Sequence, residues 1–379
     1  MSQQKINCCI MRGGTSKGIF FHEHDLPADQ AARDRLALKV FGSPDVRQID
    51  GLGGADPLTS KMAIIAKSKR PDADVDYTFG QVSIERPLVD YSGNCGNISS
   101  AVGPFAIAEG LVPAVEPITR VRIYNKNTGK ILIAEVPVSG GNVQVEGSYE
   151  IDGTPGTGAK ILMDFAGTVG SATGEMLPTG RPKDLLQVEG VGALEASIVD
   201  VANPVVFVRA KDLGLTGIET PADIDSNADL LATLERIRSL TAVMIGMATS
   251  PEEATSKCPA FPMVSFVSAP RDYRAFSSGR MVLQQDVDLV SRLMYMQVMH
   301  KTYAGTGTTC TGAAARIPGT IVNEVCAGDG PVVRIGHPSG VIEIEVGIAC
   351  QNGMVVLQRA AFGRTARRIM DGRVYVTSD

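Results

Sequence analysis

The sequence predicts an α/β fold of the α+β kind, built from two domains of similar plan. The chain of 379 residues is long enough for two domains that each bury their own core. Its 41 glycines exceed the usual share of about 7%, and such a content is typical of strands joined by many tight turns. The second half also repeats motifs of the first half in the same order, which indicates a duplicated domain.

The first half shows strand patterns that two helices interrupt. Apolar runs with near-alternating polarity predict strands at about 5–14, 18–26 and 74–85. An Asn-Thr-Gly turn between two apolar runs predicts a hairpin over 121–138. Helical patterns cover about 28–42 and 95–110, and the second of these helices opens with small residues.

The two halves align on short motifs. When Phe20 is laid on Phe207, Ser16 falls on Asn203. Further on, residues 94–97 align with residues 303–306, and each copy opens a helix rich in small residues. We place the boundary near residue 185, which gives domains 1–185 and 186–379, with the last strand a candidate to cross back to the first domain.

Composition excludes several classes of partner. The net charge of −5 and a pI near 5.5, without a cluster of Lys and Arg, give no field that attracts nucleic acid. No apolar run reaches the roughly 18 residues of a membrane span, and the N-terminus lacks a signal-peptide pattern. Seven cysteines, an odd number, fit reduced thiols in the cytoplasm. With four histidines and no metal-ligand spacing, we expect neither a metal nor a cofactor.

Cys95 is the first candidate for chemistry. It lies in Gly-Asn-Cys-Gly-Asn, where glycines leave the backbone bare and the side chains of Asn94 and Asn97 can hydrogen-bond a ligand. The positive end of a helix favours a thiolate and also binds a carboxylate through backbone N–H groups, including that of Gly96. A buried structural cysteine is the usual alternative, but the glycine and asparagine setting favours catalysis.

Lys61 is the second candidate. It follows the Gly-rich loop 53–60, which ends in Ser60, a further candidate to bind substrate, and it precedes an apolar run. A lysine at the mouth of a strand can reach inward, where it neutralises a carboxylate or, once desolvated, acts as an acid or base. The alternative is a solvated surface lysine, and Thr-Ser-Lys also occurs at 15–17 and 255–257, so the tripeptide by itself indicates nothing.

Two other glycine-rich segments have the composition of anion-binding loops. Residues 11–18 combine hydroxyl groups with Lys17 and bare N–H groups, although a plain turn between strands explains the same pattern. Residues 300–307 offer a cationic helix start in the second half. Cys310 falls inside that helix, and we interpret it as a packing residue.

These residues and longer motifs resemble a known family over essentially the whole chain. The carrying motifs include MRGGTSKGIFF, VDYSGNCGNISSAVGPFAI, HKTYAGTGTTCTGAAARIPGTIVN and GRTARRIMDGRVYV. They are similar to the methylitaconate Δ-isomerases and 2-methylaconitate isomerases, a PrpF-like family of the diaminopimelate-epimerase fold. That resemblance implies two pseudo-symmetric domains, each a β-barrel-like sheet around a central helix, with the active site in a cleft.

The resemblance also implies roles for single residues. The epimerases present one cysteine on each central helix, but here the second position holds Ala304, so a two-thiol mechanism is excluded. The family pattern places the acid/base pair at Cys95 and Lys61. It places Ser16 and Asn203 against the substrate, and the opposite wall at Lys301, Gly305, Thr306 and Gly307.

The function that these residues imply is an allylic 1,3-proton shift without a cofactor, in the isomerase class that transposes C=C bonds. The favoured substrate is a small unsaturated dicarboxylate, converted from 2-methylitaconate to 2,3-dimethylmaleate. A rival is isomerisation of 2-methylaconitate or aconitate, for which Lys17, Arg280 or Lys301 could bind the third carboxylate. More remote alternatives are an amino-acid racemase and an accessory protein of a dehydratase. A homo-oligomer is the default expectation.

Overall fold

The structure, a computed structural model, describes residues 3–351 and 354–377. Contacts divide the chain into two units. The first comprises the chain up to Ile151, Gly156–Met163 and the chain from Arg364 onward, while the second comprises Asp152–Pro155 and Asp164–Gly363. The second unit is therefore inserted into the first in sequence order. The boundary predicted near residue 185 lies inside the second unit, because β12 (Asp184–Val188) pairs there with β13 (Gly192–Val201).

The first unit holds the helices α1 (Gln30–Phe41) and α2 (Gly96–Ala108), as the helical patterns predicted. Its long strands are β1 (Gln3–Gly13), β2 (Ser16–His22), β3 (Lys61–Lys67), β4 (Val75–Val82), β6 (Ile118–Asn125), β7 (Lys130–Ser139) and β23 (Ala366–Thr377). Shorter strands are β5 (Val89–Asp90), β8 (Asn142–Val143), β9 (Tyr149–Glu150) and β10 (Thr157–Gly158). The predicted hairpin over 121–138 is formed by β6 and β7, which pair antiparallel.

The second unit holds the helices α3 (Pro221–Asp225), α4 (Ala228–Met244), α5 (Pro251–Lys257), α6 (Gly305–Arg316) and α7 (Ile321–Val325). Besides β12 and β13, its strands are β14 (Asn203–Arg209), β15 (Met263–Ser268), β16 (Tyr273–Arg274), β17 (Met281–Val282), β18 (Leu289–Tyr295), β19 (Val298–Met299), β20 (Val332–His337), β21 (Gly340–Gln351) and β22 (Met354–Arg364), whose last residue belongs to the first unit. The strand β11 (Ile161–Asp164) covers the passage from one unit to the other.

The two units repeat one strand topology. In the first, β1–β2 is antiparallel, β2–β3 parallel, β3–β4 antiparallel, β4–β6 parallel and β6–β7 antiparallel. In the second, the same order of pairings joins β13–β14, β14–β15, β15–β18, β18–β20 and β20–β21. Such a match over five consecutive pairings confirms the duplication that the short sequence motifs predicted.

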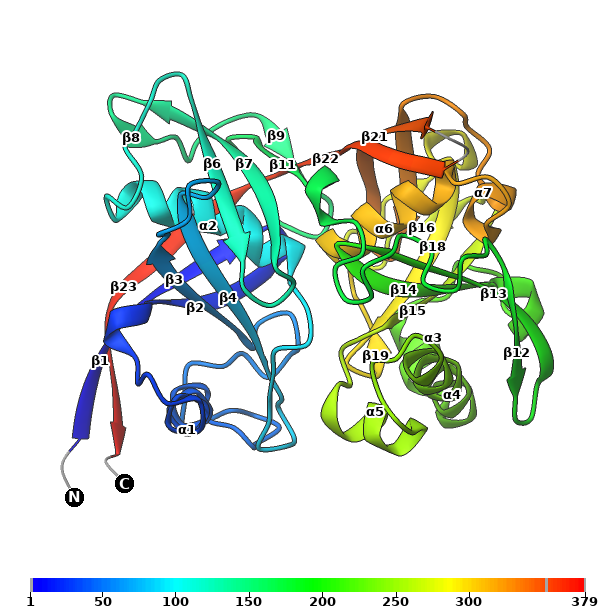
Figure 1. Ribbon diagram of the computed structural model, residues 1–379, viewed down its shortest axis with the longest axis horizontal. Helices are drawn as coiled ribbons and strands as arrows, with labels where there is room; N and C mark the ends of the chain where they lie inside the picture. Colours follow the sequence, from blue (N-terminus) through cyan, green and yellow to red (C-terminus); the bar gives the residue numbers. More distant parts are fainter. Residues whose placement is uncertain (1–2, 352–353, 378–379) are drawn as a thin grey trace. The chain divides into compact units, whose positions relative to one another are not determined.

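Each unit packs its sheet against one buried helix, α2 in the first and α6 in the second (Figure 1). The residues of α2 from Gly96 to Ile107 are all buried, and so are those of α6 from Gly305 to Ala315. A helix that is buried on every side belongs in the centre of a core. Close packing needs glycine at matching places: a Cβ on Gly103 would lie 2.8 Å from Val136, and one on Gly312 would lie 2.7 Å from Ile344.

A pair of arginine–aspartate contacts repeats in the same way. In the first unit, Asp74 accepts from the backbone N–H of Arg122 at 2.7 Å and from its Nη2 at 2.8 Å. In the second, Asp288 accepts from the backbone N–H of Arg334 at 2.8 Å and from its Nη2 at 2.7 Å. Each aspartate directly precedes one strand, β4 or β18, and joins the start of that strand to its parallel neighbour, β6 or β20.

The last strand, β23, returns to the first unit. It pairs antiparallel with β1 from Gln3↔Thr377 to Gly13↔Ala366, so the red strand lies beside the blue one in Figure 1. Gln3 and Thr377 are therefore neighbours within one sheet, and Ala366, at the start of β23, lies beside Gly13 in the first glycine-rich loop.

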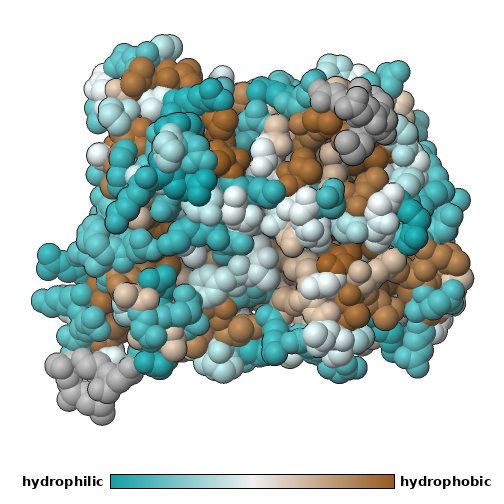
Figure 2. All heavy atoms as spheres, in the orientation of Figure 1, coloured by the Kyte–Doolittle hydropathy of each residue, from teal (hydrophilic) through white to brown (hydrophobic). Residues whose placement is uncertain are grey.

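Surface polarity is mixed. The face in Figure 2 carries hydrophilic and hydrophobic residues side by side. Among residues 3–351 and 354–377, no helix is long and apolar enough to cross a membrane.

We predict that Asp288→Ala weakens the second unit by about 1–3 kcal/mol, because it leaves a backbone N–H and a guanidinium without their acceptor. Asp74→Ala should weaken the first unit less, since the Asp74 side chain is 22% exposed and that of Asp288 is 8% exposed. Amide hydrogen exchange with mass spectrometry measures both effects. Faster exchange should be confined to β18 and β20 in the first variant and to β4 and β6 in the second; equal exchange in variant and wild type would contradict the prediction.

Candidate active site

Cys95 is the N-cap residue of α2 and is partly exposed. Its carbonyl accepts the backbone N–H of Ser99 at 2.9 Å, but its thiol makes no capping hydrogen bond. The hydroxyl of Ser99 donates to the side chain of Asn94 at 3.1 Å, which ties the residue before the cap to the first helical turn. The thiol is thus held at the positive end of a long helix without being used to cap it.

Lys61 is the first residue of β3, and its side chain is only 2% exposed. Its Nζ donates to Oε1 of Gln81 at 2.6 Å and lies 5.4 Å from the ring centre of Phe79. The same Nζ interacts with Cys95 by a hydrogen bond and by charge. Burial lowers the pKa of Lys61, against smaller opposing effects of Cys95 and Asp56. The structure therefore brings the two predicted catalytic residues together.

The loop that leads to Lys61 is held by a buried glutamine. Gln48, 1% exposed, donates from Nε2 to the hydroxyl of Ser60 at 2.8 Å and accepts the N–H of Ala55 at 2.9 Å. Ser60 in turn donates to the carbonyl of Val82 at 2.9 Å. Both of these hydrogen bonds of the Ser60 hydroxyl are made to protein groups, so Ser60 stabilises the loop in front of Lys61.

The turn between β1 and β2 lies against the start of α2. Gly14 has a φ of +52°, and a Cβ there would come within 2.3 Å of Oδ1 of Asn97. The amide of Asn97 donates to Thr15 at 3.1 Å. Ser16 follows, buried, and its Oγ makes no hydrogen bond within the structure. A buried hydroxyl without a partner is costly, and a bound polar group would satisfy it.

Arg364 belongs to this cluster, although the sequence did not single it out. Its Nε donates to Oδ1 of Asn97 at 2.9 Å, and its charge acts on Cys95. It is 3% exposed, and burial lowers its pKa to about 10, which leaves the guanidinium charged near neutral pH. The first unit thus places a buried cation beside the thiol and the helix start. The signal for it lay in the terminal GRTARRIMDGRVYV motif, but no local spacing pointed to Asn97.

Lys17 has a different environment from Ser16. Consecutive residues of a strand point to opposite faces, and the Nζ of Lys17 would lie 3.4 Å from a Cβ placed on Gly54. Its backbone N–H donates to the carbonyl of Leu58 at 2.9 Å, which joins β2 to the same loop. A substrate contact of Lys17 stays a prediction.

The predicted residues of the second unit gather at the start of α6. Asn203, at the start of β14, donates from Nδ2 to the hydroxyl of Thr306 at 2.9 Å, and both side chains are buried. Gly305 and Gly307 lie in the same buried first turn, whereas Lys301 is exposed. These residues occupy the places in the second unit that Ser16 and the Cys-Gly-Asn motif hold in the first; their contact with substrate stays a prediction.

The acid/base groups have no counterpart in the second unit. Ala304 is the N-cap of α6, where α2 has Cys95. Lys61 pairs with Gly18 across β2 and β3, and the matching pair across β14 and β15 is Val205 with Met263. An alanine and a methionine therefore stand where the first unit has the thiol and the amine, so the predicted acid/base pair lies in the first unit.

Two other cysteines are unsuited to chemistry. Cys310 is buried within α6 and donates to the carbonyl of Val199 at 3.1 Å, and burial raises its pKa, which confirms its predicted packing role. Burial also raises the pKa of Cys9 to about 12. Thiolates are thus disfavoured at both positions.

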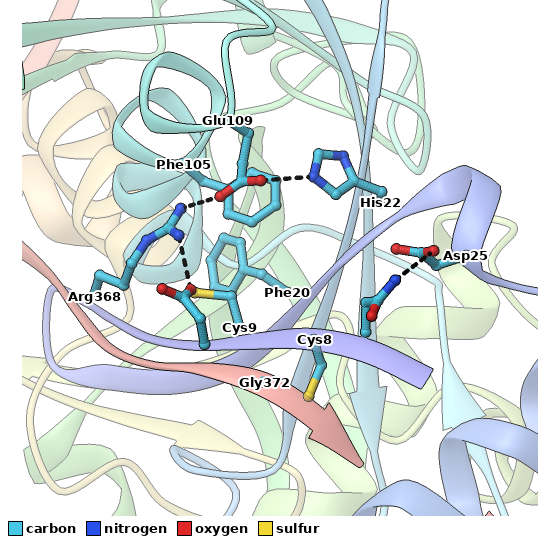
Figure 3. Close-up of a pocket in the computed structure, with 11 residues that line it drawn as sticks. Cys8, Cys9, Phe20, His22, Asp25, Phe105, Glu109, Arg368 and Gly372 are labelled. Carbon is cyan, nitrogen blue, oxygen red and sulfur yellow. Dashed lines mark hydrogen bonds and ion pairs between the residues drawn. The ribbon is translucent and has the colours of Figure 1, made fainter. Parts of the chain in front are cut away.

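A pocket of about 320 Å³ lies at the other end of α2 (Figure 3). Glu109 accepts there from Nη2 of Arg368 at 2.6 Å and is bonded to Nε2 of His22 at 3.0 Å, while Arg368 also donates to Asp371 at 2.7 Å. Burial alone would raise the pKa of Glu109, but these bonds hold it below its ordinary value. The charged groups bind one another and fasten α2 to β23, far along the helix from Cys95.

In residues 3–351 and 354–377, no group of three or more His, Cys, Asp or Glu side chains is arranged to hold a metal ion.

Comparison with known proteins decides the family, because a match to the PrpF protein family spans residues 3–377. The chain belongs to the PrpF family.

This PrpF-family chain is 62% identical over 376 residues to the 3-methylitaconate isomerase of Eubacterium barkeri, and the match covers 99% of the chain and 98% of the relative. The solved structure of a methylitaconate-delta-isomerase matches with a TM-score of 0.80 at 61% identity, over 99% of this chain and 96% of that one. A hydroxyproline epimerase from Agrobacterium vitis, 13% identical, matches with a TM-score of 0.58 over 98% and 92%. The predicted epimerase-like α/β fold is confirmed, and so is an isomerase of the PrpF family.

For this PrpF-family chain we predict that iodoacetamide at pH 7.5 labels Cys95 at least about tenfold faster than Cys9 or Cys310, because thiolate and access both govern the rate. Peptide mass spectrometry of timed samples gives the rate at each cysteine. Cys95→Ser should remove the fast phase, and Cys326→Ser, at another partly exposed cysteine, is the matched control. Labelling of Cys9 as fast as Cys95 would overturn the assignment.

Proposed function

We propose that the protein is a cofactor-independent isomerase that shifts a C=C bond in a small unsaturated dicarboxylate, with methylitaconate as the first candidate. The observation that carries the proposal is the contact between Lys61, a buried amine of lowered pKa, and Cys95 at the start of α2. An allylic shift needs one group that removes a proton and another that returns one two carbons away. This pair meets that requirement.

Lys61 acts as the base in this proposal and Cys95 as the acid. The neutral amine removes the proton from the saturated carbon that bears a carboxylate and the methyl group. The electron pair moves to form the new double bond, and the thiol of Cys95 gives its proton to the terminal methylene carbon, which becomes a methyl group. The ammonium of Lys61 then returns its proton to the thiolate of Cys95 across their hydrogen bond, so the enzyme ends as it began and no proton is consumed.

The charge that develops on the substrate carboxylate requires cations and aimed donors. The N-terminus of α2 and the buried guanidinium of Arg364 lie beside the thiol of Cys95. The unpartnered hydroxyl of Ser16 follows Thr15, which is bonded to Asn97 in the first turn of α2. Donors held in place before the reaction stabilise a dienolate more effectively than water, which must reorganise. We therefore assign Arg364 and Ser16 to binding of a substrate carboxylate.

The substrate assignment is supported by the name of the relative, a 3-methylitaconate isomerase, at 62% identity over nearly the whole chain. A tricarboxylate such as 2-methylaconitate needs one more cation. Arg280, one of the three considered for that role, is ion-paired with Asp152 at 2.6 Å, so its charge is already engaged. The lack of a second thiol at Ala304 disfavours a racemase. An accessory role for a dehydratase remains the alternative from another class.

The cytoplasm is the proposed location. This proposal rests on the acidic composition and on the free thiols of the following cysteines: Cys8, Cys9, Cys95, Cys258, Cys310 and Cys326. The proposed ligand is a small carboxylate rather than nucleic acid or a membrane. Self-association as a homo-oligomer stays a prediction.

The test is proton NMR in D₂O with methylitaconate, itaconate and cis- and trans-aconitate. We expect methylitaconate to give dimethylmaleate with deuterium in the new methyl group. Cys95→Ser and Lys61→Arg should lower the rate by about 10² to 10⁴, because each removes a proton-transfer group and arginine does not deprotonate. Cys326→Ser and Lys67→Arg are controls for the exchanges themselves. A folded protein that neither converts nor exchanges any of these acids would exclude the proposal.

Arg364→Met should lower kcat/KM by about 10- to 150-fold, the loss expected for one charged hydrogen bond of about 1.5–3 kcal/mol. Steady-state kinetics with methylitaconate measures it, and Arg364→Lys should recover part of the loss. Arg368→Met, four residues further along the chain and within β23, is the matched control, because Arg368 binds Glu109 and Asp371 instead. Unchanged kinetics in folded Arg364→Met would remove Arg364 from substrate binding.

A further inference from the structure

Gln81 is in direct contact with the proposed base, Lys61. It lies opposite Lys61 in the antiparallel pair of β3 and β4, and it is 1% exposed. Its Oε1 accepts from Nζ of Lys61 at 2.6 Å. Phe79, two residues earlier on the same face of β4, puts its ring 5.4 Å from the same nitrogen. The amine is thus held between an amide oxygen and an aromatic ring.

The orientation of the Gln81 amide is determined by its other partners. Its Nε2 donates to the carbonyl of Pro57 at 3.1 Å and to the carbonyl of Ser60 at 3.0 Å. Only the nitrogen end can satisfy two carbonyls, so the oxygen must face Lys61. A reversed amide would set donor against donor at Lys61 and acceptor against two acceptors at the loop. The loop 57–60 therefore fixes which atom the amine meets.

We propose that Gln81 is a positioning residue for the proton transfer, which fixes the Lys61 amine through an uncharged acceptor and leaves its remaining valences toward Cys95 and the substrate. The inference rests on the proposed function, because it assigns a role to a neighbour of the proposed base. A neutral amide aligns the amine without offering a counter-charge. A carboxylate in its place would form a buried ion pair and keep Lys61 protonated, which would disable it as a base.

The other groups that face Lys61 do not replace this function. Cys95 approaches from the start of α2, and Asp56 acts from the loop before β3. Tyr77 on β4 and Arg364 before β23 act on Cys95. Gln81 joins the amine to the carbonyls of Pro57 and Ser60 by hydrogen bonds, so its replacement should change the pKa of Lys61.

The experiment compares the pH dependence of kcat/KM for methylitaconate in wild type and in Gln81→Glu. Lys61 must be neutral to take a proton, so activity rises as pH increases through its pKa. A carboxylate at residue 81 raises that pKa, and we expect the acid limb to move up by about one to three pH units. Activity on the limb should fall about tenfold for each unit of the shift and return at high pH. An unmoved limb in folded, active Gln81→Glu would overturn the proposal.

Gln81→Met and Gln48→Glu separate positioning from support of the loop. Gln81→Met has no acceptor and no charge at residue 81, so kcat should fall without an upward shift of the acid limb. This variant tests the proposal if Gln81→Glu does not fold. Gln48→Glu puts a carboxylate into the same loop, where Gln48 touches Ser60 and Ala55 instead of Lys61. Its acid limb should stay within about half a unit of wild type. A shift in Gln48→Glu equal to that in Gln81→Glu, or a wild-type kcat in Gln81→Met, would contradict the role of Gln81.

A second readout distinguishes failure of this inference from failure of the proposed function. The NMR signal of the Lys61 side chain in ¹³C-lysine protein, assigned by its loss in Lys61→Met, reports the titration without any substrate. A higher midpoint in Gln81→Glu supports the inference even where none of the four acids reacts. An unchanged midpoint overturns it even where wild type isomerises methylitaconate.

Discussion

Burial of the Lys61 amine governs the structure around it. An amine taken out of water favours its neutral form, and the fold must then supply hydrogen bonds that do not restore the charge. The amide of Gln81 meets this condition, because it accepts from Lys61 without adding a counter-charge. Cys95 and Asp56 raise the pKa of Lys61, but their effects are smaller than that of burial. The loop before β3 contributes to the same environment, because its carbonyls fix the orientation of the Gln81 amide.

The duplicated scaffold explains how so small a set of groups can be held. Each unit provides a fully buried helix whose first turn adjoins the turn between two strands, through Asn97 and Thr15 in one unit and Thr306 and Asn203 in the other. Both units thus present a helix N-terminus, whose backbone N–H groups favour anions. The proposed acid/base pair lies in the first unit, since Ala304 stands where that unit has a thiol. A duplicated fold therefore carries an asymmetric set of candidate groups.

Local patterns in the sequence predicted local structure well, because the hairpin of β6 and β7, the helices α1 and α2 and the position of Cys95 depend on neighbouring residues. The contact of Lys61 with Cys95 was expected from the family resemblance, and the structure places them together. Arg364 was missed because its partner Asn97 lies 267 residues away in the chain. Gln81 looked like one more polar residue of an alternating strand, since its role depends on register. The domain boundary was misplaced because the loop near residue 185 leads into a hairpin and not into a new unit.

The route of the chain links the proposed site to the end of the sequence. The strand β23 pairs with β1 along most of its length, and Arg364 reaches Asn97 from the residues just before that strand. The first unit therefore cannot complete its sheet, or bring Arg364 to Asn97, until the whole inserted second unit has been synthesised. Apart from Asp152–Pro155, the second unit is one continuous stretch, Asp164–Gly363, so its sheet closes without spanning another unit. Long-range closure of a sheet is slow because loop entropy must be overcome first. The first unit, which holds the proposed site, should thus be the later of the two to acquire its final packing.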